Sequence, residues 1–391
     1  MKKSTYDTIL AIFCMLTPVS PGVFAKELVI VSTTLLILRI LVTRNIFYFI
    51  KKKVLIILLF TPGIIFAIFT SSENLVRFVP VLLLVIGFPF YGFKIKAQPI
   101  MVLSFFILVY FIVTQILLSF GNSTLLNFRE VWYPNDYGGF NYGIVDSLFL
   151  PLEGFRAGGL YYNPNTFAKV VLLYYLIFSV SDQYTNQNNI NLLKKKSIMR
   201  KILYLVVLSF VSFSLFFTSS RTAMITLITY IGLQSFDMTL LKKGFIKKDT
   251  LWGMLFASIF LLFIGEKIWD GVVSSEGSAN TKFYILVSYL ADANFLDLLF
   301  GGNFNIQFDN EYGNWIGSTG FFGMLAWFFI LRMIYITIPS IRDLIFPFLM
   351  TAVGSTLFYG LLTGSIVIIL LVITSSFWWQ SNTENENSID L

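Results

Sequence analysis

Long apolar segments recur along this chain of 391 residues, and they limit its fold more than any other feature of the sequence. A helix that crosses a bilayer needs about 20 mostly apolar residues. Segments of this kind predict about twelve spans, near residues 5–20, 27–43, 54–70, 76–93, 99–119, 166–181, 202–218, 222–238, 250–265, 315–335, 342–358 and 361–379. The sequence therefore predicts an all-α polytopic membrane protein.

The proportion of charged residues supports the same fold class. Only 13% of the residues are charged, against about 25% in soluble globular proteins. So few charged side chains cannot cover a surface that faces water, which excludes a soluble enzyme and a disordered chain. A nucleic-acid-binding protein is excluded as well, although the formal net charge is +7. The excess positive charge is expected on the cytoplasmic side of a membrane.

The positions of the lysine and arginine residues predict the orientation of the spans. With a cytoplasmic N-terminus and an uncleaved first helix, alternation of the spans places every basic cluster on the cytoplasmic side, including Lys51–Lys53 and Lys194–Lys196. Both termini are then cytoplasmic. Fewer basic residues fall on the outer side, namely Lys26, Arg77, Arg129, Arg156, Lys169, Arg221, Lys267 and Lys282.

Two residue types that carry much enzyme chemistry are absent or nearly absent. The chain has no histidine, which excludes a Ser-His-Asp triad and histidine-bound metals. Its one cysteine, Cys14, excludes an intrachain disulfide and a cysteine zinc cluster. Any chemistry must use carboxylates, amides, hydroxyls, lysine or arginine, and the sequence predicts no metal site and no cofactor.

Two segments are too polar to span a membrane and too long to be simple turns. They cover residues 120–165 and 266–314, and both fall on the outer side. Residues 1–381 are predicted to form one transmembrane domain that carries both loops, and residues 382–391 a disordered cytoplasmic tail. Because loops that meet a rigid scaffold commonly carry function, a site is expected where the two loops meet the helix ends.

The composition of each outer loop has two interpretations. The first loop is rich in aromatic, carboxylate and amide side chains, which suit the polar rims and apolar faces of sugars, but an aromatic belt at the membrane interface has the same composition. The second loop has apolar residues at helical spacing from Phe283 to Leu290, which is typical of an amphipathic helix on the outer leaflet. The alternative is a helix that only seals the bundle.

Arg221 is the most informative of the outer basic residues. It follows Ser219 and Ser220 between two predicted spans, so it is expected at a helix N-terminus, where the helix dipole disfavours a cation. A bound anion offsets that penalty, and a serine N-cap with free amide groups in the first turn favours an anion site. The alternative is an arginine that snorkels to a lipid phosphate. The same two interpretations apply to Arg77, near the start of another span. Because arginine prefers bidentate contact with phosphate oxygens, these residues indicate a lipid-borne phosphate or diphosphate.

Three stretches resemble the bacterial O-antigen polymerase and ligase family of membrane glycosyltransferases. The first is RAGGLYYNPN at residues 156–165, similar to a Gly-rich segment that ends in Asn-Pro-Asn before a span. The second is SSRTA at residues 219–223, similar to the family's Ser-Arg at the outer start of a helix. The third runs from Lys282 through LFGG and DNEY to GFFG at residues 320–323. Their order and spacing make the resemblance more specific than any one stretch.

The resemblance implies a GT-C-like bundle in the bacterial inner membrane with its active site on the periplasmic side. The implied function is a polymerase that joins oligosaccharide repeat units, carried on undecaprenyl diphosphate, into O-antigen or a similar surface polysaccharide. A chain-length regulator and a flippase of the same pathway are the implied partners. Ligases of the family carry a His-Asn pair where this chain has Asp309-Asn310, and this departure favours a polymerase. The chain also has Lys282 where arginine is usual, and a lysine ammonium group cannot make the bidentate contact that an arginine guanidinium makes.

The resemblance also implies roles for individual residues. Arg221 and Arg156 are expected to hold the departing diphosphate, which gains negative charge. Asp309, with Glu311 as the second candidate, is expected to act as base or orienting acceptor for the incoming hydroxyl. Asp309 has an alternative role as a helix cap, and the Asn-Pro-Asn stretch has one as a turn. The expected substrate-binding residues are Arg77, Arg129, Lys282, Glu311, Asn163, Asn165 and Tyr312.

Three other functions remain alternatives. A flippase or transporter of the lipid-linked glycan would bind the same lipid, but it is expected to carry charges deep within its spans and paired broken helices. An O-antigen ligase, which transfers the polymer to lipid A core, would lack its expected histidine. A structural membrane subunit would leave the outer arginines without a purpose.

Overall fold

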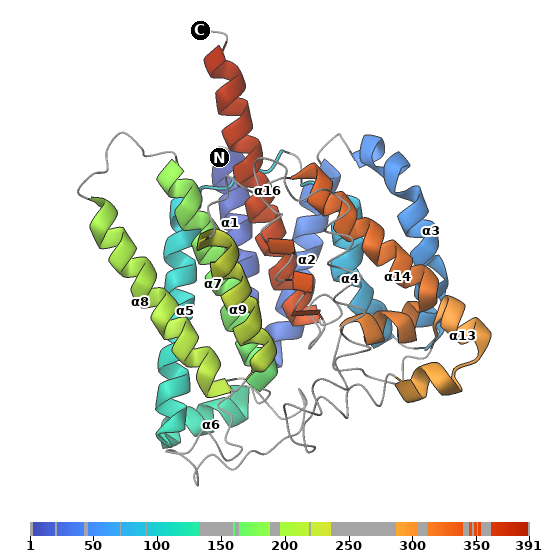
Figure 1. Cartoon of the computed structure of the whole chain (residues 1–391), viewed down its shortest axis with the longest axis horizontal. Coiled ribbons are helices and arrows are strands. Elements are labelled where there is room, and N and C mark those ends of the chain that lie inside the picture. The colour runs from blue at the N-terminus through green and yellow to red at the C-terminus, as the bar shows by residue number, and fades with distance from the viewer. Residues whose placement is uncertain are drawn as a thin grey trace. The chain divides into compact units, whose positions relative to one another are not determined.

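All of the regular secondary structure in the described residues is helical. The computed structural model describes residues 3–19, 22–42, 46–70, 72–90, 92–132, 159–160, 164–187, 196–218, 220–235, 287–302, 311–338, 344–345, 348–349, 351–352 and 361–389. Figure 1 labels the elements α1 (Lys3–Leu16), η1 (Thr17–Val19), α2 (Gly22–Val42), α3 (Ile46–Thr70), α4 (Ser72–Gly87), α5 (Ala97–Ser119), α6 (Ser123–Trp132), α7 (Pro164–Gln187), α8 (Lys196–Thr218), α9 (Arg221–Ser235), α13 (Phe295–Phe300), α14 (Glu311–Thr337) and α16 (Leu361–Ile389). The expected all-α fold is confirmed for this part of the chain.

Three helices are long and apolar enough to cross a membrane, among the residues that the structure describes. They are Ala97–Ser119, Glu311–Thr337 and Thr363–Ser381. Shorter apolar helices cover Lys53–Phe69, Phe78–Gly87, Ile202–Thr218 and Thr222–Ile231. Each of these helices overlaps a span predicted from the sequence. The predicted span near 250–265 lies outside the described residues.

The contacts within the chain divide it into two compact units. Unit 1 comprises Met1–Lys51, Pro80–Met224 and Leu361–Leu391, and unit 2 comprises Lys52–Val79 and Ile225–Gly360. Helices α3, α4 and α9 therefore contribute to both units. Each unit joins segments that are distant in the sequence, and the single transmembrane domain expected over residues 1–381 stays a prediction.

Helix α7 forms the centre of unit 1, and its residues from 167 to 179 are all buried. It runs antiparallel to α5, because Phe111 of α5 contacts Phe167 and Tyr174 whereas the earlier Phe105 contacts Phe178. Ring centroids in these pairs lie 5.8–6.4 Å apart. A helix surrounded by neighbours has to be apolar around its whole circumference, which explains why the sequence of α7 shows little polar–apolar periodicity.

Helix α8 packs against both α5 and α7, and it runs parallel to α5. Gln115 of α5 exchanges hydrogen bonds with Ser214 near the end of α8, at 2.6 Å to the side chain and 3.3 Å to the backbone carbonyl. Earlier along α8, the hydroxyl of Tyr204 lies 2.8 Å from that of Tyr175 in the middle of α7. The C-terminal ends of α5 and α8 and the N-terminal end of α7 therefore lie at the same end of unit 1, as the cyan and green helices of Figure 1 show.

Local capping explains where α5 ends and α6 begins. Gly121 has a φ of 71°, a left-handed conformation that glycine adopts readily. The amides of residues 120–122 bond back to carbonyls of the last turn of α5, as in a glycine-terminated helix. Asn122 then accepts a hydrogen bond from Leu125 N at 3.0 Å, which is the N-cap contact of α6. Helix α6, which carries Arg129, is thus tied to the end of α5.

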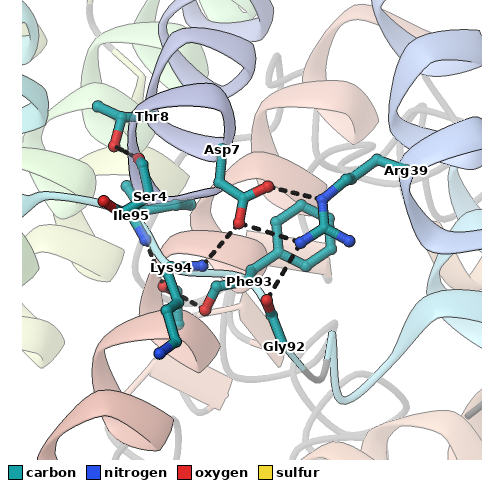
Figure 2. Close-up of polar contacts among 9 residues, drawn as sticks. Ser4, Asp7, Thr8, Arg39, Gly92, Phe93, Lys94 and Ile95 are labelled. Carbon is teal, nitrogen blue, oxygen red and sulfur yellow. Dashed lines mark hydrogen bonds and ion pairs between the residues drawn. The ribbon is translucent and has the colours of Figure 1, made fainter. Parts of the chain in front are cut away.

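A buried ion pair lies at the opposite end of unit 1, where α5 begins (Figure 2). Asp7 of α1 is fully buried, and both of its carboxylate oxygens accept hydrogen bonds from Arg39 of α2, at 2.6 and 3.0 Å. The Arg39 guanidinium also donates to the carbonyl of Gly92 at 3.1 Å and lies over the ring of Phe93. Bidentate geometry of this kind is the strongest form of an arginine–carboxylate contact.

The non-helical segment between α4 and α5 is held by side chains from three helices. Asp7 Oδ2 accepts from the amide of Lys94, and Thr8 Oγ1 accepts from that of Lys96. From α16, Ser376 Oγ accepts from the amide of Ile95 and donates to the carbonyl of Phe93. Gln380 and Trp379 donate to further carbonyls of the segment. Buried backbone groups outside helices need such partners.

In unit 2, α14 is a broken helix whose break receives the end of α13. Gly320 has a φ of 64° and a ψ of −165°, which interrupts the helical hydrogen bonds of α14. The amide of Gly302, just after α13, donates to the freed carbonyl of Ser318 at 3.2 Å. A Cβ on Gly320 would collide with the carbonyl group of Leu299, and one on Gly301 with the backbone of Ser318. Gly301 and Gly320 therefore allow the backbone at the end of α13 to contact the backbone of α14 at its break.

We expect Gly320→Ala to destabilise the protein far more than Gly121→Ala. Both positions have a positive φ, which strains an alanine, and the ψ of −165° at Gly320 lies in a region that essentially only glycine adopts. Only at Gly320 does the added Cβ also meet another backbone, since the space around Gly121 is open within 4 Å. Unfolding temperatures of the two detergent-purified variants measure the difference, and equal temperatures would contradict the proposed backbone contact.

The C-terminal segment differs from the expectation of a disordered tail over residues 382–391. Helix α16 continues to Ile389. The sequence after Gly364 has no proline or glycine to end the helix, and polarity alone does not terminate one because glutamate is a good helix former.

Candidate functional site

The starts of α7 and α9 bring two of the three resemblance stretches to one end of unit 1. The Asn-Pro-Asn stretch ends at the start of α7, with Pro164 at the first helical position, which proline favours. The Ser-Arg stretch ends at the start of α9, whose first residue is Arg221. Because α8 ends beside the start of α7 and only two residues separate α8 from α9, both motifs lie at this end. Asn165 and Arg221, which are far apart in the sequence, thus lie at the same end of unit 1.

Two hydrogen bonds of Ser220 connect the end of α8 to the start of α9. Ser220 is buried, and its carbonyl accepts the first helical hydrogen bond, from Met224 N at 3.1 Å. The hydroxyl of Thr218, at the end of α8, accepts a hydrogen bond from the amide of Ser220 at 3.3 Å. The predicted position of Arg221 at a helix N-terminus is therefore confirmed. The amides of a first helical turn, together with the helix dipole, favour a bound anion.

Helix α6 adds Arg129 to the same end of unit 1. The first outer loop, predicted over residues 120–165, begins with this helix, which the sequence analysis did not anticipate. The sequence does contain a signal for this helix, namely an asparagine that can cap a helix N-terminus, followed by a short amphipathic stretch. Arg129 lies on the second half of α6, so a positive charge is carried on a helix anchored to α5.

Lys169 is a basic residue at this end that sequence reasoning counted but did not select. It lies one turn after Asn165 on α7, on the same face of the helix. Its side chain is only 6% exposed, whereas Asn165 is half-buried. An ionisable residue within an apolar helix is costly and commonly functional. That rule applied to the sequence KVVLLYYL would have singled out Lys169.

The start of α14 in unit 2 carries Glu311 and Tyr312, and both side chains are buried. Glu311 is 0% exposed, and its Oε1 accepts a hydrogen bond from Nε1 of Trp315 at 2.8 Å. The hydroxyl of Tyr312 donates to the carbonyl of Leu349 at 3.3 Å. The substrate contacts predicted for both residues stay a prediction, and both side chains are buried in the structure.

Arg77 belongs to the same part of unit 2. It lies on α4 directly before Phe78, whose ring meets Trp315 edge to face at 5.8 Å. The helix that carries Arg77 and the start of α14 are therefore neighbours.

The second outer loop contains a helical segment at residues 287–292 followed by α13. Phe295 and Leu296 at the start of α13 are 73% and 64% exposed. The amphipathic helix expected from Phe283 to Leu290 begins outside the described residues. Burial raises the pKa of Tyr289, and the negative charge of Asp297 raises it further. Tyr289 therefore stays a neutral phenol at physiological pH.

Several predicted site residues fall outside the described part of the chain. Arg156, Asn163, Lys282 and Asp309 lie outside the described residues. Arg77, Arg129 and Arg221 are placed on their helices by their backbones alone. In the part of the chain that is described, no three His, Cys, Asp or Glu side chains form a group that could hold a metal ion.

The fold defines the class of this protein as an all-helical one, with three described helices that could cross a membrane. Comparisons with protein-family models, with curated proteins and with solved structures found no match for the chain.

Proposed function

We propose that this chain is a polymerase of lipid-linked oligosaccharide repeat units in the bacterial inner membrane. It has about twelve spans, and its two outer loops face the periplasm. The donor is a growing glycan on undecaprenyl diphosphate, and the acceptor is one repeat unit on a second such lipid. The product is O-antigen or a similar surface polysaccharide.

The observation that supports this proposal is that α7 and α9, which follow two of the resemblance motifs, both begin at one end of unit 1. Asn165 and Arg221 lie at the starts of α7 and α9, and α6 brings Arg129 to the same end. The buried Lys169 adds a positive charge one turn away from Asn165. Two helix N-termini and several cations at one end suit a diphosphate, which is a dianion or trianion with many acceptor oxygens.

The proposed reaction is the one that the resemblance to the polymerase family implies. A hydroxyl oxygen of the acceptor sugar attacks the anomeric carbon of the donor glycan, and the bond from that carbon to the diphosphate oxygen breaks. The hydroxyl proton passes to Asp309, which acts as general base. The lipid diphosphate leaves with the bonding electron pair, and Arg221 and Arg156 stabilise its growing negative charge. Lys282, Asn163 and the remaining candidates hold the two glycans.

A strain that lacks this chain is expected to display single repeat units on its surface instead of long glycan chains. Polymerisation is the only step removed, so units still cross the membrane and are still attached. Gel electrophoresis of the surface glycan measures the ladder, and the wild-type chain supplied in trans restores it. Lipid-linked units trapped on the cytoplasmic leaflet would indicate a flippase, and an unchanged ladder would contradict the proposed function.

A further inference from the structure

The segment between α4 and α5 lies inside unit 1, at the end where α5 begins. Its side chains Phe88, Phe90, Phe93 and Ile95 are at most 2% exposed. The rings of the three phenylalanines meet edge to face, with centroids 6.0 and 6.3 Å apart. Connections between helices commonly run over the surface, because buried backbone outside a helix needs hydrogen-bond partners. This connection is instead an interior element, and its partners come from other helices.

The backbone at Phe90 shows that packing holds the segment in one arrangement. Phe90 has a φ of 54°, a left-handed conformation that bulky residues rarely adopt. Its amide donates to the carbonyl of Gly87 at 2.7 Å. A residue keeps such a conformation only where its surroundings over-determine it. Here those surroundings include the buried rings of Phe88 and Phe93.

Helices α1 and α2 bind the segment through their buried ion pair. Figure 2 shows Asp7 accepting from the amide of Lys94, and Arg39 donating to the carbonyl of Gly92. Asp7 and Arg39 also bond to each other, so neither helix can move away from the other and from the segment without breaking the pair. Breaking a buried pair is strongly destabilising, because it leaves an uncompensated buried charge.

Helix α16 binds the same segment through two side chains that also contact each other. Ser376 Oγ donates to the carbonyl of Phe93 and accepts from the amide of Ile95. Gln380 Nε2 donates to the carbonyl of Ile95 at 3.0 Å and to Ser376 Oγ at 2.9 Å. The hydroxyl of Ser376 thus uses its donor and both of its acceptor lone pairs. Three helices therefore hold one buried segment.

We propose that the segment between α4 and α5 is a permanent closure of this end of unit 1, which stays shut while the protein works. Lys94 and Lys96 of the segment are exposed and belong to the basic residues that predict the cytoplasmic side. The protein then takes its lipid-linked substrates from the opposite end only. The inference rests on the proposed function, in which donor and acceptor both lie on the outer side. It argues against a flippase, because a transporter opens to each side in turn.

The burial of the contacts favours a closure that does not open. An element that opens in each cycle needs a second arrangement of similar free energy. Contacts that open repeatedly are expected to be exposed, because water then replaces the lost partner, whereas a buried group that loses its partner has none. Asp7, Arg39 and Ser376 are all buried. Opening this end would leave their partners on the segment unsatisfied.

Cys14, the one cysteine of the chain, reports whether this end opens. It lies two turns after Asp7 on the same face of α1 and is 3% exposed. Its thiol donates to the carbonyl of Ser32 in α2 at 3.8 Å, so it lies between α1 and α2. The next carbonyl, that of Met15, accepts from the hydroxyl of Tyr174 in the middle of α7, which places this part of α1 in the interior of unit 1. A thiol reagent that comes from the end near Asp7 therefore reaches Cys14 only if the helices part there.

The first measurement uses the wild-type chain. A membrane-impermeant maleimide is added to inverted membrane vesicles, which expose the cytoplasmic side, and the labelling of Cys14 is compared with that of the denatured protein. The vesicles come from cells that make the lipid-linked repeat unit and from cells that do not. We expect the thiol to stay protected in both, because the closed end keeps the reagent away.

The second measurement loosens the closure. The Ser376→Ala/Gln380→Ala double variant loses the bonds of α16 to the segment and keeps the buried ion pair. We expect its Cys14 to be labelled about tenfold faster than that of wild type, or more, because the segment opens locally more often. Ser381→Ala is the matched control, because its hydroxyl donates to the carbonyl of Trp378 within α16. This control is expected to be labelled as slowly as wild type.

Three results would overturn the closure. They are rapid labelling of the wild-type chain, labelling of the wild-type chain that rises when the lipid-linked unit is present, and a double variant that is labelled no faster than wild type. A rise with the lipid would also favour a flippase. The wild-type measurement decides the question even if the double variant does not fold. If wild-type membranes made no polymer while Cys14 stayed protected, the proposed function would fail and the closure would stand.

Discussion

Arg221→Ala is expected to abolish long glycan chains while the protein still inserts and accumulates in the membrane. Arg221 is the first residue of α9, so its loss removes a cation at a helix N-terminus. If the guanidinium holds the leaving diphosphate, the polymerisation rate falls about a hundredfold or more, as for other groups that stabilise charge in a transition state. A gel of the surface glycan measures the length of the glycan chains, and an immunoblot of the membrane fraction measures the amount of protein.

Two control variants sharpen this prediction. Arg221→Lys keeps a positive charge without the bidentate fork, so an intermediate chain length is expected. Lys94→Ala removes an exposed lysine side chain at the opposite end of unit 1 and leaves its backbone bond to Asp7 in place. It is expected to give normal chains. A normal ladder from Arg221→Ala would remove the main support for the diphosphate site.

Arg39→Ala is expected to produce the largest loss of stability of any single change considered. It leaves the carboxylate of Asp7 fully buried without its ion-pair partner. Removing one member of a buried pair costs about 3–5 kcal/mol, and it also removes the donor to the carbonyl of Gly92. The unfolding temperature in detergent and the amount of protein in the membrane are both expected to fall.

A double variant tests whether the loss comes from the unpaired charge. Asp7→Asn combined with Arg39→Gln keeps an amide donor and acceptor at the two positions and removes both charges. It is expected to be more stable than Arg39→Ala alone, because no ion remains buried without a partner. If Arg39→Ala unfolded at the wild-type temperature, the pair would contribute nothing to the stability of unit 1.

Some helices could be predicted from the sequence to within a few residues, whereas α3 begins at Ile46 instead of the expected residue 54 and α16 ends at Ile389 instead of residue 379. The span expected at 99–119 is Ala97–Ser119, and the span expected at 202–218 ends at Thr218 as α8 does. Both depend on local properties, namely a run of apolar residues and a glycine or serine at its end. A helix inserts where its own residues are apolar, so its neighbours need not be known.

Contacts between helices could not be predicted in the same way. Asp7 and Arg39 are 32 positions apart and belong to different helices, and the sequence analysis treated Arg39 only as one more cytoplasmic charge. Glu311 and Trp315 are four positions apart on α14, so a helix places them on one face, but nothing local in the stretch EYGNW shows that this face is buried. Which face of a helix is buried depends on its partners, and an apolar helix in a bilayer gives no polar face from which to infer them.

The bonds around the segment between α4 and α5 set an order of assembly. Asp7 and Thr8 are synthesised before this segment, so they are available when it leaves the ribosome. Ser376 and Gln380 follow it by more than 280 positions, and until α16 is made the amide of Ile95 and the carbonyl of Phe93 have to be satisfied by water or lipid headgroups. The first helices of the chain therefore complete their fold only after translation of the last one.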